Sequence, residues 1–337
     1  MLFSLGLAFV LPFEGFILAY SVLGPLHYLT EINWLRKRNF FTLSPRDFWW
    51  LLLPCTCSFI CYFLYYYREA EWLAPILASV FGAQTPAAIG FFREFTAHFI
   101  LAGFTGAFAT VVFRGHWWRA GFTLGGLLLG WWLYGQHFYT LLTAFLPTLL
   151  HVTLFTGAFV LLGALRHNGP SGYLSMLAFA GCIVAALFLP LLPAGYSATA
   201  WAWESFQWSK FEFLNLLVGR FFDPELNLSA LWKSDLGIQT QRLVTFSYTY
   251  HYLNWFSKTS FIGWHRVPRR VLFTTLGIWL LAVGLYAYDF RTGLMALLLL
   301  SNLHVIFEFP LNFRSFRDIG QLTAARLGLR SVPLKNQ

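Results

Sequence analysis

The chain has 337 residues, of which 58% are hydrophobic and 11% are charged. Soluble domains carry about 25% charged residues, so this composition leaves too little polar surface for a water-soluble globule. The formal net charge is +9, but the Lys and Arg residues occur in short clusters between apolar stretches. That arrangement is typical of membrane orientation rather than of a nucleic-acid-binding face. The expected solvent is therefore a lipid bilayer, and nucleic acid is excluded as a partner.

Apolar stretches long enough to cross a bilayer, at about 20 residues per crossing, occur nine times. They cover residues 3–24, 48–66, 88–112, 117–134, 139–165, 172–192, 240–257, 271–288 and 293–311. We therefore predict an all-α, polytopic helical bundle with nine transmembrane helices in a single domain over residues 1–337. The first stretch lacks a basic leader and contains Glu14, so we expect a retained helix rather than a cleaved signal peptide.

Basic residues indicate how the bundle is oriented. If the nine crossings are right, most basic clusters fall on one side of the membrane, including Arg36, Lys37, Arg38 and Arg46 after the first span, and Arg314, Arg317 and Arg326 in the tail. Because cytoplasmic loops are enriched in Lys and Arg, we predict an N-terminus outside and a cytoplasmic C-terminus. The expected location is the inner (plasma) membrane of a bacterium.

The segment of residues 193–239 lacks the continuous apolar stretch that a transmembrane helix needs. Many aromatic residues in this segment are interrupted by charged ones, among them Lys210, Glu212 and Arg220. We predict an extracytoplasmic segment that lies at the membrane interface and that offers a contact surface for a membrane-protein partner.

The span at 117–134 contains two G-x-x-x-G pairs. Gly121 precedes Gly125, and Gly126 precedes Gly130, at a spacing of four residues. Small residues at this spacing let two helices approach closely, so we predict close helix packing here.

Histidine and glutamate residues recur at a spacing of four residues. An ionisable group at membrane depth costs about 3 kcal/mol or more, so each one is a candidate functional residue. Random placement of 9 His and 14 acidic residues would give only about 0.7 such pairs. In a helix, this spacing puts both side chains on one face. The chain has three pairs in apolar surroundings: His27 with Glu31, Glu94 with His98, and His304 with Glu308.

The residue types in these pairs suit a metal ion. Imidazole and carboxylate ligands favour iron, zinc or manganese, and helix bundles build di-iron sites from inward-facing Glu and His side chains. The i,i+4 spacing differs from the i,i+3 Glu-x-x-His of ferritin-like sites. We expect one or two metal ions near the cytoplasmic half of the bilayer, with His27, Glu31, Glu94, His98, His251, His304 and Glu308 as ligands or close supporting residues. The residues expected to support them or to line a pocket are His151, Tyr250, Asn254 and Arg93, the last of which could also pair with Glu14.

The stretch Gly24-Pro25-Leu26-His27, followed by Glu31, resembles a motif of the Brp/Blh family of membrane-embedded, iron-dependent carotenoid cleavage enzymes. That family has a Pro-His pair with an acidic residue four positions on. The resemblance covers this motif and the general inventory of helices and intramembrane histidines. Glu31 stands where the family has Asp, and its other histidine motifs have no counterpart here. The resemblance implies that a site of this kind can oxidise a hydrophobic substrate.

The ligand types support one main functional hypothesis and leave others open. We expect a membrane oxidoreductase that uses non-haem iron and O₂ on a lipophilic substrate such as an isoprenoid, a carotenoid or an acyl chain. An intramembrane zinc hydrolase is the alternative enzyme. A polar network in a proton-coupled carrier or in a subunit of a membrane complex is the alternative without catalysis. Haem ligation needs only two facing histidines and leaves the glutamates without a role.

Overall fold

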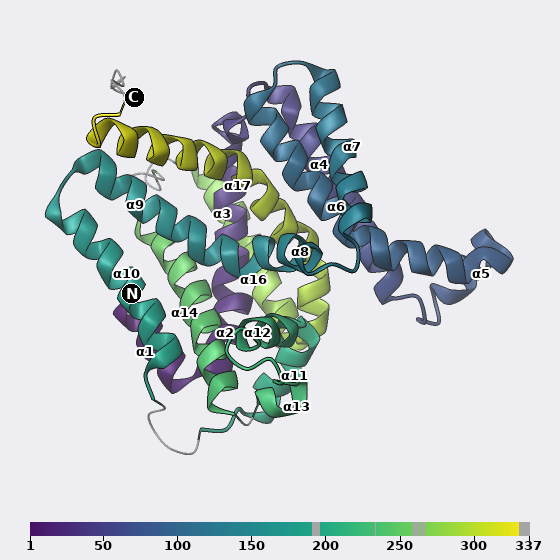
Figure 1. The fold of residues 1–337 in the computed structure, drawn as a ribbon. Helices are drawn as coiled ribbons and strands as arrows, with labels where there is room; N and C mark the ends of the chain where they lie inside the picture. Colours follow the sequence, from purple (N-terminus) through teal and green to yellow (C-terminus); the bar gives the residue numbers. More distant parts are fainter. Residues whose placement is uncertain (191–195, 233, 259–262, 264–266, 330–337) are drawn as a thin grey trace. The chain divides into compact units, whose positions relative to one another are not determined.

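The computed structural model describes residues 1–190, 196–232, 234–258, 263 and 267–329. All regular elements of these residues are helices (Figure 1). The first half contains α1 (Leu2–Val10), α2 (Pro12–Leu18), η1 (Ala19–Leu23), α3 (Gly24–Arg36), η2 (Asn39–Phe41), η3 (Pro45–Asp47), α4 (Phe48–Tyr66), α5 (Ala74–Phe81), η4 (Gly82–Gln84), α6 (Thr85–Val112), α7 (His116–Leu133) and α8 (His137–Thr140). The second half contains η5 (Leu141–Phe155), α9 (Thr156–His167), α10 (Pro170–Phe188), α11 (Ala200–Ser209), α12 (Phe211–Gly219), α13 (Leu228–Leu231), α14 (Asp235–Ser257), α16 (Arg269–Tyr288) and α17 (Phe290–Arg326).

Helices long and apolar enough to cross a membrane number six among the described residues. They are Pro45–Tyr66, Ala74–Val112, Phe138–His167, Pro170–Phe188, Arg269–Tyr288 and Phe290–Arg326, and each overlaps one of the predicted spans. The predicted spans at 117–134 and 240–257 are helical, as α7 and α14, but are not among the six. The all-helical membrane class is therefore supported, whereas the count of nine and the orientation stay predictions.

The apolar stretch 3–24, predicted as one span, is not one helix. α1 ends at Val10, and the next residue, Leu11, has a φ of −135° and a ψ of 66° that break the helix, because a following proline disfavours helical geometry in the residue before it. α1 then folds back on α2, so that a Cβ on Gly15 would lie 2.9 Å from Cγ of Leu7. The longer helical run begins at Pro12 and continues through η1 into α3.

Two compact units are defined by the packing of the chain. The first unit comprises residues 1–30, 148–294 and 314–337, and the second comprises residues 31–147 and 295–313. α3 and η5 each begin in one unit and end in the other, whereas α17 begins and ends in the first unit and contributes residues 295–313 to the second. The expected single domain over the whole chain stays a prediction.

Local sequence signals mark the starts of several helices. Before α4, the Asp47 side chain accepts a hydrogen bond from the backbone N–H of Ser44 at 2.9 Å. Asp289 caps α17 by accepting from the backbone N–H of Thr292 at 2.7 Å and from its hydroxyl at 2.6 Å. These hydrogen bonds lower the pKa of Asp289, and the one from the Thr292 hydroxyl has the larger effect. Pro170 opens α10, where a missing N–H carries no penalty.

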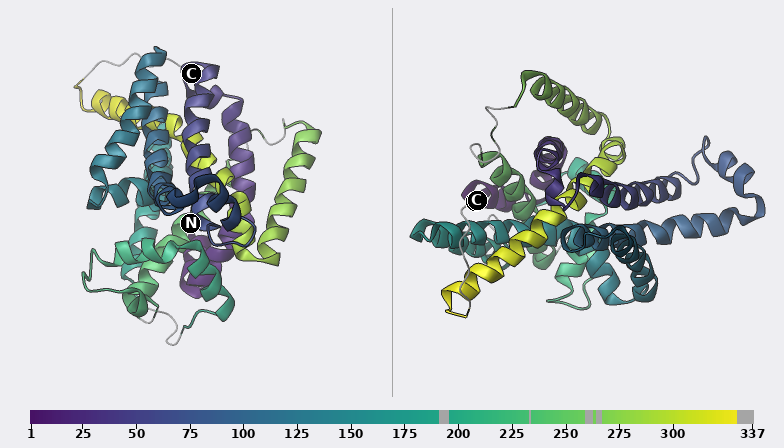
Figure 2. Two further views of the ribbon diagram at one scale, coloured as in Figure 1. Left: turned by 90° about the vertical axis from the view of Figure 1, so that its right-hand side faces the viewer. Right: turned by 90° about the horizontal axis from the view of Figure 1, so that it is seen from above.

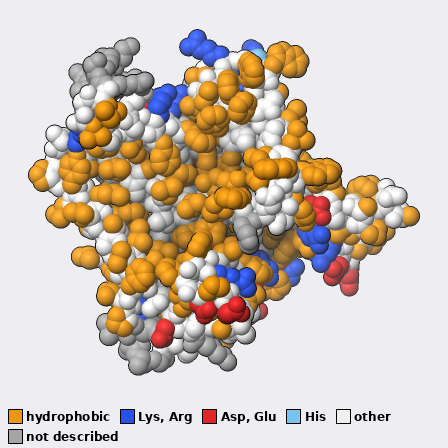
Figure 3. Space-filling model, viewed as in Figure 1, with side chains coloured by type: hydrophobic (Ala, Val, Ile, Leu, Met, Phe, Trp, Pro, Cys, Tyr) orange, Lys and Arg blue, Asp and Glu red, His pale blue; other side chains and the backbone are white. Residues whose placement is uncertain are grey.

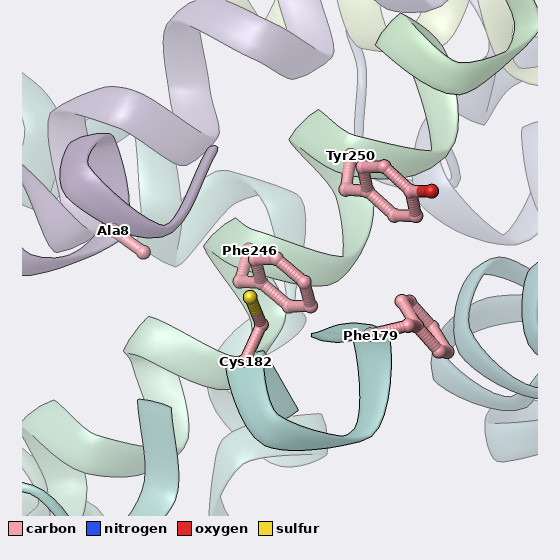
Figure 4. Close-up of a cluster of buried hydrophobic side chains, with 5 residues drawn as sticks. All are labelled: Ala8, Phe179, Cys182, Phe246 and Tyr250. Atoms are coloured by element: carbon pink, nitrogen blue, oxygen red, sulfur yellow. The ribbon is translucent and has the colours of Figure 1, made fainter. Parts of the chain in front are cut away.

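One apolar cluster in the core of the first unit lies between α1, α10 and α14. Ala8, Phe179, Cys182, Phe246 and Tyr250 are buried together there (Figure 4). Phe246 and Tyr250, one turn apart on α14, stack with ring centroids 5.8 Å apart. This packing turns the Tyr250 ring towards α10.

Exposed apolar side chains cover two of the membrane-length helices of this unit. α10 exposes Leu174, Leu177 and Val184, and α16 exposes Leu280 and Leu281. Figure 3 shows apolar side chains crowded over α9 and α10, and in both views of Figure 2 α16 stands apart from α14. Surfaces of this kind suit lipid contact rather than water.

Within the predicted interfacial segment 193–239, the described residues 196–232 contain three short helices, α11, α12 and α13, and α14 begins at Asp235. Glu14 of α2 accepts a hydrogen bond from the Tyr196 hydroxyl at 2.6 Å. The Asn215 amide of α12 donates to the Gln241 side chain of α14 at 2.6 Å. These contacts tie the segment to α2 and α14, while its extracytoplasmic, interfacial position and its partner stay predictions.

Glycines let α6 and α7 of the second unit approach closely. A Cβ on Gly126 would lie 2.8 Å from the backbone of α6, and one on Gly130 would lie 2.7 Å from the His98 ring. Added Cβ atoms on Gly121 and Gly125 would meet nothing within 4 Å. Close packing is therefore confirmed for the second of the two predicted G-x-x-x-G pairs and not for the first.

A buried ion pair between Asp47 and Arg119 joins η3 to α7 in the same unit. The Arg119 Nε also donates to the Phe113 carbonyl at 2.9 Å. Breaking a buried ion pair is strongly disfavoured, because it leaves an uncompensated charge. Arg119 therefore stays in place, and its hydrogen bond to Phe113 holds the connection between α6 and α7.

We expect Gly126→Ala to lower the melting temperature of the detergent-solubilised protein. The new methyl group meets the α6 backbone, and overpacking costs about 1–3 kcal/mol. Gly125→Ala is the matched control on the same helix, where Ala removes only the flexibility of Gly and gains up to about 1 kcal/mol. Equal melting temperatures for the two variants would contradict the close packing of α6 and α7.

Candidate metal centre

Three buried histidines from different helices gather in the first unit. His27 lies on α3, His151 on η5 and His251 on α14. The Nε2 atoms of His27 and His251 are 3.0 Å apart, and the rings of His151 and His251 have centroids 5.1 Å apart. The structure therefore brings together two predicted ligands and one predicted pocket residue.

Both ring nitrogens of His251 have a partner. Its Nδ1 is 2.8 Å from the Thr156 hydroxyl and its Nε2 is 3.0 Å from Nε2 of His27. If Nδ1–H donates to Thr156, Nε2 of His251 accepts a hydrogen bond from the Nε2–H of His27. In that tautomer the ring lone pair of His27 is on Nδ1, and a ligating histidine usually donates its other N–H to a supporting group in this way.

Aromatic side chains of α14 hold His27 in place. The His27 ring packs against Tyr252 and Trp255, with centroids 5.1 and 5.6 Å away. Tyr252 also shares a hydrogen bond of 3.1 Å with the Tyr28 hydroxyl. A Cβ on Gly24 would lie 3.0 Å from that hydroxyl, so the absence of a side chain at Gly24 makes room for this contact.

In the second unit, α3 and α17 bring a carboxylate and an imidazole together. Glu31 and His304 are buried, and each offers a ligand atom within 4.8 Å of the other. Glu308, one turn beyond His304 on α17, is also buried. Close packing fixes this part of α17, because a Cβ on Gly103 of α6 would lie 3.1 Å from the Ile306 side chain.

α3 carries ligand-type residues of both units. His27 and Glu31 are one turn apart on this helix, with ligand atoms within 4.8 Å of each other. His27 belongs to the histidine cluster of the first unit, and Glu31 lies beside His304 in the second. The spacing of four residues therefore places both side chains on one face of α3, as predicted.

Glu94 and His98 lie elsewhere in the second unit. Glu94 is half-exposed and pairs with Arg93 at 3.5 Å. His98 is buried, with Nδ1 2.8 Å from the Glu94 backbone carbonyl and 3.2 Å from the Tyr139 hydroxyl. Within the described residues, no group of three ligand-type side chains includes Glu94 or His98.

The other predicted supporting residues have different surroundings. Arg93 pairs with Glu94, while Glu14 accepts hydrogen bonds from residues of the segment before α11. Tyr250 packs in the apolar core of Figure 4. Asn254 is half-buried, and its carbonyl oxygen accepts from the Ser257 hydroxyl. None of these contacts involves the histidine cluster.

Thr156 and Trp255 are the contact residues that sequence reasoning missed. A threonine and a tryptophan in apolar spans carry no spacing signal of their own. The Trp255 indole N–H donates to the Thr30 hydroxyl at 3.0 Å. That contact joins residues far apart in the chain, so no local sequence pattern predicts it.

Comparisons of the chain with models of protein families, with curated proteins and with solved structures find no match. The chemistry of the site therefore rests on its own residues.

We expect Thr156→Val to lower the affinity for a metal ion by up to about 10-fold, because it removes the hydrogen bond that orients His251, and losing a group bonded directly to a ligand costs about 10–100-fold. Thr143→Val is the control, since the Thr143 hydroxyl donates only to the Tyr139 carbonyl of its own helical run. Equilibrium dialysis of both purified variants measures the effect. Equal affinities in the two variants would rule out the supporting role of Thr156.

Proposed function

We propose that the protein is a membrane-embedded, metal-dependent oxidoreductase in which His27, Glu31 and His304 hold one non-haem iron ion. The Glu31 carboxylate carries this proposal, since it lies within 4.8 Å of ligand atoms on His27, one turn back along α3, and on His304 of α17. Two histidines and one carboxylate form the ligand set typical of non-haem iron oxygenases, which leaves coordination positions open.

Charge supports a divalent cation at these residues. Two neutral imidazoles and the Glu31 carboxylate would leave a divalent ion with one uncompensated positive charge. The buried carboxylate of Glu308 lies one turn beyond His304, so it would bring the group to neutrality. Neutrality matters because isolated charges away from water are strongly disfavoured.

The chain's own groups define the roles around this ion. In the tautomer described above, His251 accepts a hydrogen bond from the Nε2–H of His27 and donates its own Nδ1–H to Thr156, which fixes the orientation of the His27 ring. In this account His251 supports a ligand rather than binding the metal. His151 packs its ring against His251 and is the third histidine of this cluster.

A lipophilic substrate is the second part of the proposal. The rings of Tyr252 and Trp255 give His27 apolar walls, and apolar pockets with a few polar groups are typical of small-molecule sites. Bound iron with open positions would supply oxygen activation. An isoprenoid, a carotenoid or an acyl chain in a bacterial plasma membrane fits these surroundings.

Metal analysis of matched Gln variants tests the proposal. The wild-type protein should retain iron at about one ion per chain or above, and Glu31→Gln and His304→Gln should lose most of it because each removes a ligand. Glu94→Gln and His98→Gln alter a pair of the same spacing outside the site, so they should retain it. Full retention in all four variants would refute the site.

The same measurement separates the alternatives. Stoichiometric zinc would favour an intramembrane hydrolase, with three protein ligands and Glu308 as the base for bound water. Two ions per chain would extend the centre to His151 and His251. A wild-type protein that binds no metal in its folded state would favour a polar network in a carrier or a complex subunit.

A further inference from the structure

Arg242 is a completely buried arginine in the first half of α14, and its side chain is 0% exposed. Its Nη1 donates to the Leu189 carbonyl, just after α10, at 3.0 Å. Its guanidinium carbon lies 4.2 Å from the centroid of the Phe9 ring of α1. Three helices of the first unit thus converge on one cation.

One edge of this guanidinium is unused. Nε and Nη2 of Arg242 are buried and have no hydrogen-bond partner among the described residues. These two nitrogens form the edge with which arginine holds two oxygens of a carboxylate or a phosphate at once. The two N–H groups point in parallel, so together they suit a ligand that offers two oxygens, such as an oxyanion, better than a ligand with one acceptor atom.

No acidic side chain in the described part of the chain forms an ion pair with Arg242. Asp235 is exposed at the start of α14, seven residues before Arg242 and so about 10 Å away along the helix axis. The carbonyl and the aromatic ring compensate only part of a buried positive charge, because a buried charge persists only where it is paired and hydrogen-bonded.

We infer that Arg242 binds a phosphate oxyanion through its Nε and Nη2 atoms, from a lipid headgroup or from free phosphate. The site lies where α1 and α10 end. Val10 and Phe188, the last residues of these helices, expose their side chains, as does Leu189. Apolar side chains that surround a basic group are the usual setting for a headgroup phosphate at a membrane boundary.

This site is separate from the proposed metal centre. Arg242 precedes His251 by nine residues, which is about two and a half helical turns and puts the two side chains on opposite faces of α14. Phe246, between them in the chain, faces the α1–α10 core of Figure 4. A ligand at Arg242 therefore does not depend on the metal.

The test compares wild-type protein with Arg242→Gln and Arg242→Lys, each delipidated in an uncharged detergent. Melting temperatures are measured with inorganic phosphate, with phosphatidylglycerol in mixed micelles, and with potassium chloride at equal ionic strength. Arg220→Gln is the control, because Arg220 also donates to a backbone carbonyl, that of Leu226 at 3.0 Å, but is exposed.

We expect phosphate or phosphatidylglycerol to raise the wild-type and Arg220→Gln melting temperatures above the chloride value. Arg242→Gln should weaken that binding by about 10-fold or more, since charge-assisted hydrogen bonds contribute about 1.5–3 kcal/mol. Arg242→Lys keeps the charge without the fork and should weaken binding too.

The two additives identify the source of the oxyanion. A shift with inorganic phosphate assigns a free ion, and a shift with phosphatidylglycerol alone assigns a lipid headgroup. No shift beyond chloride in the wild-type protein, or equal shifts in wild-type and both Arg242 variants, would overturn the inference. If Arg242→Gln fails to fold, Arg242→Lys decides.

Discussion

Polar groups buried inside a helical membrane protein must be matched to one another, and α3 carries the pair on which the proposed site depends. His27 and Glu31 are one turn apart and buried. An imidazole and a carboxylate without partners in such surroundings are disfavoured by several kcal/mol. His27 meets His251, and Glu31 lies beside His304. His251 of α14 and His304 of α17 thus lie where they supply polar neighbours for the two buried side chains of α3.

α14 shows the same constraint along a whole helix. Gln241 and Thr245 are completely buried, and the Gln241 amide donates to the Pro12 carbonyl at 2.9 Å and to the Thr245 hydroxyl at 3.1 Å. A carbonyl oxygen has two lone pairs, so the Pro12 carbonyl at the start of α2 can accept from side chains of α14 as well as from a backbone N–H of its own helix. A polar helix can thus be buried when backbone carbonyls of a neighbouring helix accept from its side chains. This explains why α14 is not among the apolar spans and yet belongs to the core of its unit.

Composition and apolar length predicted the all-helical membrane class, because lipid allows few other solutions for the backbone. The i,i+4 spacing also predicted that His27 and Glu31 share a face, since helix geometry alone dictates that result. The break at Leu11 was predictable in principle from Pro12. Hydropathy hid it, because the residues on both sides of the break are apolar.

Which pairs assemble could not be read from spacing. Glu94 and His98 have the same spacing as His304 and Glu308, but Glu94 turns outward to Arg93 and His98 packs on Gly130. That difference depends on which helix lies opposite, a long-range property that a local pattern does not contain. Arg119 is a similar case, since its local sequence does not predict the buried ion pair that it forms with Asp47.

An anomalous scattering map at the iron edge, recorded from crystals of the purified protein, tests the central claim most directly. The proposed centre predicts a single strong peak at about 2 Å from a nitrogen of His27, a nitrogen of His304 and a carboxylate oxygen of Glu31. Iron bound at stoichiometric amounts with its peak away from these three residues, at Glu94 and His98 for example, would contradict it.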